Sequence, residues 1–215
     1  MRDQDYWQIK FKMCQYSKRL LNQLLILNEH IKDKVDIIEI KKAIYYARKY
    51  HADQKRQSGE PYYSHPIEVA YIVATYTAQT RPRFFRTDMI VTSLLHDCLE
   101  DTNITEETIN IIFGSKVANQ VQDLTRIKPE KKISVVEMIN SLFIQGKSDI
   151  LIIKIFDRLH NMRTLYAKSS EKIDKTVNET LCYFVPLAMH LNMNDIANEL
   201  INISLKYLLG RNCKL

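Results

Sequence analysis

Apolar residues recur at helical spacing near the start of the chain. Between residues 6 and 31, leucines at positions 20, 21, 24, 25 and 27 fall on the spacing expected for the buried face of an amphipathic helix. The charged run at 32–34 interrupts this pattern, and the apolar spacing resumes over 36–51. We therefore predict one amphipathic helix over 6–31 and a second over 36–51.

Proline and glycine divide the rest of the chain. Gly59 stands in an expected loop at 52–64, and Pro66 suits the first turn of a helix, where a missing N–H costs nothing. Gly114 is placed to end a helix, and Pro186 should kink or end one near residue 185. Further helices are predicted at 66–80, 89–99, 105–113, 115–126, 133–145, 148–167, 174–191 and 193–209.

Composition supports helices throughout. The 215 residues include only 4 Gly and 5 Pro, whereas folds rich in tight turns need many residues that accept positive φ. We predict an all-α bundle of roughly 9–11 helices. Helices of the length that this number implies are ordinary in globular proteins. A chain of this length fits one domain with an addition. The expected division is an extra N-terminal helix at 1–35, the domain at 36–209 and a tail at 210–215.

Charge and cysteine usage limit the partners. The net charge of +6 favours an anionic partner, but the basic residues form no long block, so no nucleic-acid partner is expected. Cys14, Cys98, Cys182 and Cys213 are far apart and are predicted to be buried free thiols in a reducing compartment. No run approaches the ~20 apolar residues that span a bilayer, and no apolar leader opens the chain. We predict a cytoplasmic protein with no membrane partner.

Candidate chemistry begins at His96 and Asp97, which follow the apolar run of a predicted core helix. An unpaired carboxylate there would be costly to desolvate, and a bound cation removes that cost. Glu100 and Asp101 lie four residues further on, so they share the sides of the helix that carry His96 and Asp97. Such crowding suits acid–base chemistry. The alternative is an incidental His–Asp pair followed by a solvated helix end.

Asp157 ends a second apolar run, over residues 150–156. A carboxylate at that border either faces water or coordinates a ligand. Asn161 lies one helical turn later, and Arg158 and Arg163 have the planar donors that match phosphate oxygens. The competing interpretation is that both arginines only solvate the helix.

His65 is the third candidate, because it stands just before Pro66 at the expected start of a helix. It could equally be a half-exposed residue near a helix end. Nothing in the sequence pairs His51, His160 or His190 with a second ligand, so these three are predicted to be structural or surface histidines.

A mixed set of two histidines and two aspartates would leave coordination positions open for water or substrate. The set consists of His65, His96, Asp97 and Asp157. Such nitrogen and oxygen donors suit Mn²⁺, Fe²⁺ or Zn²⁺, and the lack of thiolates disfavours a closed structural zinc site.

These segments resemble the HD hydrolase domain of the RelA/SpoT family, which degrades the alarmones ppGpp and pppGpp. The resemblance covers roughly residues 38–207. It is carried by 56–66 (R-Q-S-G-E-P-Y-Y-S-H-P), 94–102 (L-L-H-D-C-L-E-D-T), 157–165 (D-R-L-H-N-M-R-T-L) and 180–188 (T-L-C-Y-F-V-P-L-A), with weaker matches at 113–118 and 124–125.

The resemblance implies an all-helical HD-domain bundle that removes the 3′-pyrophosphate of (p)ppGpp, giving GDP or GTP and pyrophosphate. It implies Mn²⁺ held by His65, His96, Asp97 and Asp157. Glu100 and Asp101 would position or deprotonate the attacking water. The substrate pocket would be lined by Arg56, Ser58, Asn161 and Thr164.

Two positions depart from the family pattern. Gln57 stands where the family often has lysine, and Phe156 stands where it often has alanine. The chain ends soon after residue 207, so we expect a standalone small hydrolase or a truncated relative. The helix at 6–31 could pack on the domain, mediate a homodimer or have little effect. The alternatives are a phosphohydrolase acting on another phosphorylated nucleotide and a non-catalytic alarmone-binding regulator.

Overall fold

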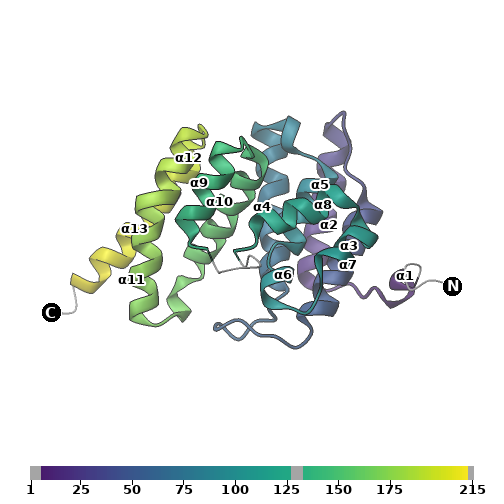
Figure 1. The fold of residues 1–215 in the computed structure, drawn as a ribbon, viewed down its shortest axis with the longest axis horizontal. Coiled ribbons are helices and arrows are strands. Elements are labelled where there is room, and N and C mark those ends of the chain that lie inside the picture. The colour runs from purple at the N-terminus through teal and green to yellow at the C-terminus, as the bar shows by residue number, and fades with distance from the viewer. Residues whose placement is uncertain (1–5, 127–132, 213–215) are drawn as a thin grey trace. The chain divides into compact units, whose positions relative to one another are not determined.

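The computed structural model describes residues 6–126 and 133–212 (Figure 1). Throughout these residues every regular element is a helix, and the one β-type pairing is an isolated bridge between Lys55 and Pro61. The predicted all-α class is confirmed. Within the same residues, no helix is both long enough and apolar enough to cross a bilayer.

The described chain forms two compact units. The first runs through Ile153 apart from residues 57–59, and the second consists of 57–59 together with the chain from Lys154 onward. The helix α10 (Ser148–Arg163) therefore contributes residues to both. The division into 1–35, 36–209 and 210–215 stays a prediction.

Packed helices surround the core of the first unit. The core includes Leu20, Leu24, Ile44, Ile67 and Leu94, all without exposed surface. Full burial of one such side chain is worth about 1.5–3 kcal/mol. The helices are α1 (Trp7–Lys10), α2 (Gln15–His30), α3 (Ile37–His51), α4 (Ser64–Thr80), α5 (Thr87–Leu95), α6 (Cys98–Asp101), α7 (Glu106–Phe113), α8 (Ser115–Leu124) and α9 (Val135–Ile144), with a 3₁₀ turn at Pro82–Phe84.

The single helix predicted over 6–31 is wrong, because the chain breaks between α1 and α2. Phe11 is extended, and Cys14 is extended as the N-cap of α2. The Ser17 hydroxyl accepts from the Cys14 amide at 2.8 Å, which satisfies a donor that a continuous helix would have bonded internally. The apolar spacing predicted helical structure in this region but not the break made by this local capping exchange.

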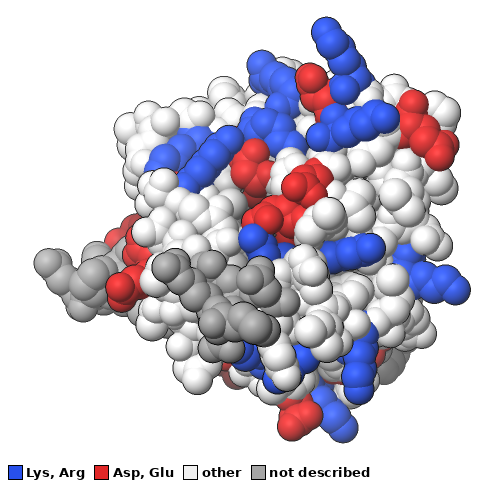
Figure 2. All heavy atoms as spheres, turned by 90° about the vertical axis from the view of Figure 1, so that its right-hand side faces the viewer, with Lys and Arg blue, Asp and Glu red and all other residues white. Residues whose placement is uncertain are grey.

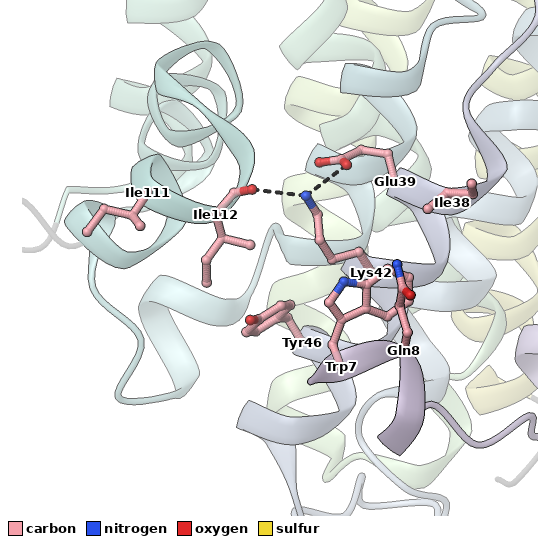
Figure 3. A pocket seen from close by; sticks show the side chains of 8 residues that line it. All are labelled: Trp7, Gln8, Ile38, Glu39, Lys42, Tyr46, Ile111 and Ile112. Carbon is pink, nitrogen blue, oxygen red and sulfur yellow. Dashed lines mark hydrogen bonds and ion pairs between the residues drawn. The ribbon is translucent and has the colours of Figure 1, made fainter. Parts of the chain in front are cut away.

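The short helix α1 packs on α3 through Trp7, which is buried. A cavity of about 320 Å³ lies beside it, lined by residues of α1, α3 and α7 (Figure 3). Lys42 reaches into this cavity, where its Nζ lies 2.8 Å from a Glu39 carboxylate oxygen and donates to the Ile112 carbonyl at 3.1 Å. The charge of Lys42 is therefore already matched within the first unit.

A polar network ties α5 to α8 and to the first turn of α10. Arg86 donates to both carboxylate oxygens of Asp88 and to Asp149, and Gln120 donates to the same two aspartates. Burial alone would raise the pKa of Asp88, but hydrogen bonds from Arg86, Gln120 and Lys116 outweigh it and lower that pKa to about 2. No side-chain hydrogen bond caps the N-terminus of α5, and the Thr87 hydroxyl at its first position instead accepts from the Asp36 amide at 2.9 Å.

The second unit contains the later residues of α10 and three further helices. These are α11 (Ser170–Glu179), α12 (Val185–His190) and α13 (Asn194–Asn212), with a 3₁₀ turn at Leu165–Ala167. A π-helical turn, Thr180–Phe184, separates α11 from α12. Pro186 follows it at the start of α12, so the predicted interruption near residue 185 is confirmed.

Cysteine burial differs from the prediction. Cys14, Cys98 and Cys182 are free, but only Cys98 of these three is buried, and Cys182 in the π-helical turn is exposed. Cys213 lies outside the described residues. The large separation of the cysteines along the sequence predicted free thiols correctly. It could not predict that Cys182, in the π-helical turn, is exposed.

On the face of the first unit shown in Figure 2, lysine and arginine side chains are interspersed with acidic ones. This mixture agrees with the spread of basic residues along the sequence. The excess positive charge is not concentrated into one uninterrupted stripe on this face.

Candidate metal centre

A loop between α3 and α4 brings His65 into the first unit. The Tyr62 amide donates to the Gln54 carbonyl and the Arg56 amide donates to the Glu60 carbonyl, both at 2.8 Å, so the chain turns back on itself. Gly59 at the tip has φ +89°, a conformation that favours glycine. His65 then occupies the second position of α4 and is almost fully buried.

His96 and Asp97 lie in a turn rather than inside one helix. The helix predicted over 89–99 is wrong, because α5 ends at Leu95 and α6 begins at Cys98. The Asp101 amide nevertheless donates to the Asp97 carbonyl at 2.9 Å, so these two residues remain one turn apart. The break projects the two candidate ligands from the end of a buried helix.

Asp97 lies against both histidines of the first unit. Its Oδ1 is 3.2 Å from His96 Nε2, and its Oδ2 is 3.5 Å from His65 Nε2. The two imidazole rings are 5.1 Å apart between centroids. The structure thus brings together three of the four predicted ligands.

The hydrogen bonding of His96 fits a metal ligand. Its Nδ1 lies 2.8 Å from the Ser93 carbonyl, which can only accept, so Nδ1 must carry the proton. In the neutral ring, the lone pair of Nε2 then faces the Asp97 carboxylate. Two electron-rich atoms at this separation repel each other unless a proton or cation lies near both. A divalent cation held by nitrogen and carboxylate ligands meets this requirement, and an Nδ1–H bonded to a carbonyl is the usual support for such a ligand.

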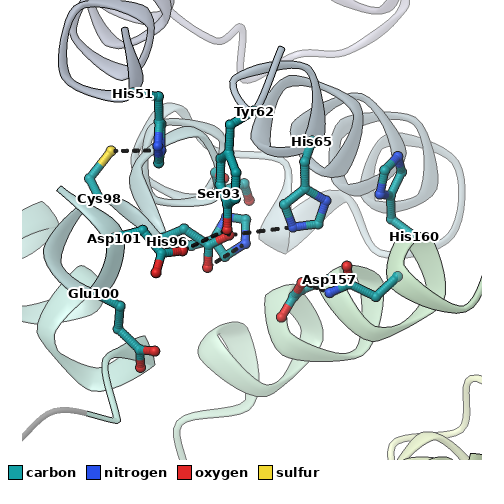
Figure 4. Close-up of polar contacts among 12 residues, drawn as sticks. His51, Tyr62, His65, Ser93, His96, Cys98, Glu100, Asp101, Asp157 and His160 are labelled. Atoms are coloured by element: carbon teal, nitrogen blue, oxygen red, sulfur yellow. Dashed lines mark hydrogen bonds and ion pairs between the residues drawn. The ribbon is translucent and has the colours of Figure 1, made fainter. Parts of the chain in front are cut away.

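Tyr62 is a member of the site that the sequence did not single out. Its hydroxyl lies 2.6 Å from Asp101 Oδ2 (Figure 4) and 3.0 Å from Asp97 Oδ2. Burial raises the pKa of Tyr62, and the negative charges of Asp97 and Asp101 raise it further, so the phenol stays protonated. The only sequence signal was an aromatic residue three positions before His65.

Glu100 and Asp101 have different surroundings, although the sequence treats them as a pair. Asp101 is exposed and bonds to Tyr62. Glu100 accepts from the Arg126 amide, and its carboxylate lies 3.6 Å from the Arg126 guanidinium. Asp101 is therefore linked to Asp97 through the Tyr62 hydroxyl, whereas Glu100 is bonded to Arg126.

His51 was predicted to be a structural or surface histidine; it is fully buried beside the candidate centre. Its ring stacks on Tyr62 with centroids 4.6 Å apart, and its Nδ1 lies 2.8 Å from Gln54 Oε1. Burial lowers the pKa of His51. Its Nε2 contacts the buried Cys98 thiol at 3.7 Å, and burial raises the pKa of that thiol.

The remaining predicted ligand, Asp157, belongs to the second unit. It is buried, its carboxylate lies 2.9 Å from Lys154 Nζ, and it accepts from Asn161 Nδ2 at 2.6 Å. The Thr164 hydroxyl donates to the His160 carbonyl at 3.1 Å. The assignment of Asp157 to the same ion as His65 stays a prediction.

The assignment of Arg56 and Ser58 to a substrate pocket stays a prediction, whereas the two arginines of α10 have ion-pair partners in the structure. Arg56 lies in the loop before Gly59, and within the described chain the buried Ser58 hydroxyl has no hydrogen-bond partner. Arg158 pairs with Glu179 at 2.9 Å and Arg163 with Glu199 at 2.7 Å. Neither arginine merely solvates its helix, because both join α10 to neighbouring helices of the second unit.

An all-helical unit that presents two histidines and an aspartate at helix ends is a candidate metal-dependent hydrolase domain. The family defined as "HD domain" matches residues 43–194, which is most of the chain. This chain belongs to the HD domain family. His96 and Asp97 are adjacent in the sequence, and their place at the candidate centre agrees with that membership.

Several curated proteins are similar to this chain. The GTP pyrophosphokinase rsh of Brucella ovis is 36% identical over 183 residues, covering 81% of this chain and 24% of that protein. A guanosine-3′,5′-bis(diphosphate) 3′-pyrophosphohydrolase of Aquifex aeolicus is 37% identical over 173 residues, covering 79% and 24% respectively. The chain thus spans about a quarter of the length of these relatives. They confirm the resemblance to RelA/SpoT sequences.

A solved structure has the same fold. It is described as a metazoan ortholog of SpoT that hydrolyzes ppGpp, and it covers 77% of this chain and 93% of its own. The TM-score is 0.61 at 23% sequence identity. This likeness supports the fold independently of the sequence matches.

Proposed function

We propose that this chain is a metal-dependent hydrolase that removes the 3′-pyrophosphate of (p)ppGpp, giving GDP or GTP and pyrophosphate. The observation that carries the proposal is the position of Asp97 between the Nε2 atoms of His65 and His96. Similar proteins are named for this reaction, among them the one from Aquifex aeolicus. The net charge of +6 is suited to a substrate with several phosphates.

The proposed ligands are His65, His96, Asp97 and Asp157. The first three are supported by their mutual distances, and Asp157 is assigned from the D-R-L-H-N-M-R motif. We propose Mn²⁺ as the ion, because a mixed nitrogen and oxygen donor set without thiolates suits it. An ion in this position supplies Lewis-acid activation of water and of the phosphoester.

The proposed chemistry breaks the bond between O3′ and its phosphorus. Water supplies the oxygen that bonds to phosphorus, and O3′ leaves with a proton as the nucleoside hydroxyl. Asp101 is suited to accept the proton of the attacking water, because its carboxylate lies beside Asp97 through Tyr62 and is exposed. Glu100, bonded to Arg126, is suited to a supporting role in positioning that water.

We propose that Arg56, Ser58, Asn161 and Thr164 contact the substrate. A buried hydroxyl without a partner, as in Ser58, is costly, and a bound nucleotide would offset that cost. A guanidinium such as that of Arg56 binds phosphate oxygens in pairs. Gln57 would add no positive charge where the family often has lysine.

A substrate panel tests the proposed reaction. Purified protein with Mn²⁺ is expected to release pyrophosphate from ppGpp and pppGpp but not from GDP or GTP, which lack the 3′-diphosphate. Nucleotides with a 2′- or 3′-monophosphate form the comparison set, and products are separated by anion-exchange chromatography. Preferential hydrolysis of a monophosphate would indicate a different HD phosphohydrolase. Tight ppGpp binding without turnover would indicate a regulator.

The cellular location is part of the same proposal. The three described cysteines are free, including the exposed Cys182. Free thiols persist in a reducing compartment, so we propose that the protein acts in the cytoplasm.

A further inference from the structure

We propose that Tyr62 is a positioning residue, whose hydroxyl fixes the carboxylates of Asp97 and Asp101 relative to each other. For its effect on turnover this inference rests on the proposed function. Its effect on metal binding does not, because Asp97 contacts both histidines whatever the substrate is.

One hydroxyl lies between two carboxylates that come from different parts of the site. Tyr62 belongs to the loop before α4, Asp97 to the turn after α5, and Asp101 to the end of α6. The phenol oxygen is 2.6 Å from Asp101 and 3.0 Å from Asp97. A hydroxyl has a single hydrogen, so it can donate fully to only one carboxylate at a time. The shorter contact identifies Asp101 as the main acceptor.

The ring of Tyr62 is itself held firmly. One face stacks on His51, and the ring meets His65 edge-on with centroids 6.3 Å apart. Its amide donates to the Gln54 carbonyl at 2.8 Å, and its carbonyl accepts from the His65 amide at 3.0 Å. A side chain locked by packing and backbone bonds can impose its geometry on the groups that it contacts.

Asp101 depends on this loop for its position. It is exposed and ends α6, a helix of only four residues. Gln54 Nε2 donates to its backbone carbonyl at 2.7 Å, while Tyr62 holds its carboxylate. Gln54 is in turn bonded to His51. Without the hydroxyl, the Asp101 backbone would keep its support, but its carboxylate would be free to rotate into solvent.

This arrangement links metal binding to proton transfer. A ligating carboxylate usually needs an outer hydrogen bond to stay oriented, and the Tyr62 hydroxyl lies 3.0 Å from Asp97 as its second, weaker acceptor. The same hydroxyl keeps the carboxylate of Asp101, the proposed acceptor of the water proton, close to Asp97. Tyr62 is proposed to contact neither the attacking water nor the phosphorus; it acts through the two aspartates.

The test compares Tyr62→Phe with Tyr63→Phe. The neighbouring Tyr63 is a matched control, since its ring packs against the Arg48 guanidinium, 5.0 Å from its centroid, outside the aspartate network. Mn²⁺ affinity is measured by isothermal titration without substrate. Tyr62→Phe is expected to weaken Mn²⁺ binding about 10-fold and to lower kcat for ppGpp by about 10- to 100-fold at saturating Mn²⁺. KM is expected to stay within about 2-fold, because the substrate contacts are elsewhere, and Tyr63→Phe should match the wild type.

A double variant tests whether Tyr62 acts through Asp101. In the Asp101→Asn background, adding Tyr62→Phe should lower kcat by no more than about 3-fold further, because coupled residues are not additive. Wild-type Mn²⁺ affinity together with wild-type kcat in Tyr62→Phe would overturn the inference, as would full additivity in the double variant. If the chain does not hydrolyse ppGpp at all, the proposed function fails, and the Mn²⁺ titration still decides the metal-binding role of Tyr62.

Discussion

Replacing Asp97 by asparagine is expected to abolish Mn²⁺ binding at micromolar concentrations and to lower ppGpp hydrolysis by at least about 1000-fold. The two oxygens of Asp97 face the two histidine Nε2 atoms, so the negative charge of this side chain lies where the proposed ion would bind. Asparagine keeps the volume but loses the negative charge. Losing the ion's stabilisation of the transition state is worth several kcal/mol, and each 1.36 kcal/mol corresponds to about tenfold in rate.

Pyrophosphate release and Mn²⁺ titration measure this effect in the same protein preparation. Asp53→Asn is the matched control, because Asp53 is an exposed aspartate of the same unit that follows α3. Thermal unfolding establishes that both variants are folded. An Asp97→Asn protein that binds Mn²⁺ as tightly as the wild type would contradict the assignment of Asp97 as a ligand.

Replacing Asp101 by asparagine is expected to separate catalysis from metal binding. A positioned general base contributes about 10²- to 10⁴-fold in rate, so kcat should fall within that range while Mn²⁺ affinity changes by less than about 3-fold. The reason is that Asp101 reaches the candidate centre through Tyr62 and is not itself in contact with either histidine in the described geometry. Steady-state kinetics at saturating Mn²⁺ measure kcat, and a separate titration measures the Mn²⁺ affinity.

Glu100→Gln is the informative comparison for Asp101→Asn. Glu100 is engaged by the amide and guanidinium of Arg126, so we expect its replacement to lower kcat less than Asp101→Asn does. A larger loss in Glu100→Gln than in Asp101→Asn would reverse the two proposed roles. A loss of Mn²⁺ binding in Asp101→Asn would place Asp101 among the ligands.

Helical periodicity predicted most of the fold because the core selects apolar residues at one face of each helix. The apolar run of α5 and four of the five leucines of α2 illustrate this, since they are buried where the spacing indicated. Leu25 was placed on the same face and is exposed. Periodicity did not predict the break at Cys14 or the turn at His96 and Asp97. At both places, side-chain bonding and local backbone geometry decide the outcome, and these leave little trace in the apolar pattern.

The candidate site was predictable in part. His96 and Asp97 stood out as polar residues at the end of an apolar run, and the family motif added His65 and Asp157. Tyr62 was not identified, because its role depends on a loop that folds back over α6 and not on spacing within one helix. The different surroundings of Glu100 and Asp101 were equally hidden, since Arg126 is distant from both in the sequence.

The most direct test of the central claim follows hydrolysis as metal-free protein is loaded with Mn²⁺. Chelator-treated wild-type protein is mixed with ppGpp, Mn²⁺ is added stepwise, and bound ion and released pyrophosphate are measured together. We predict no release without metal, a rate that rises in proportion to bound Mn²⁺, and a plateau at one ion per chain with GDP and pyrophosphate in equal amounts. Equal hydrolysis by the metal-free protein, or none by the fully loaded protein, would contradict the account.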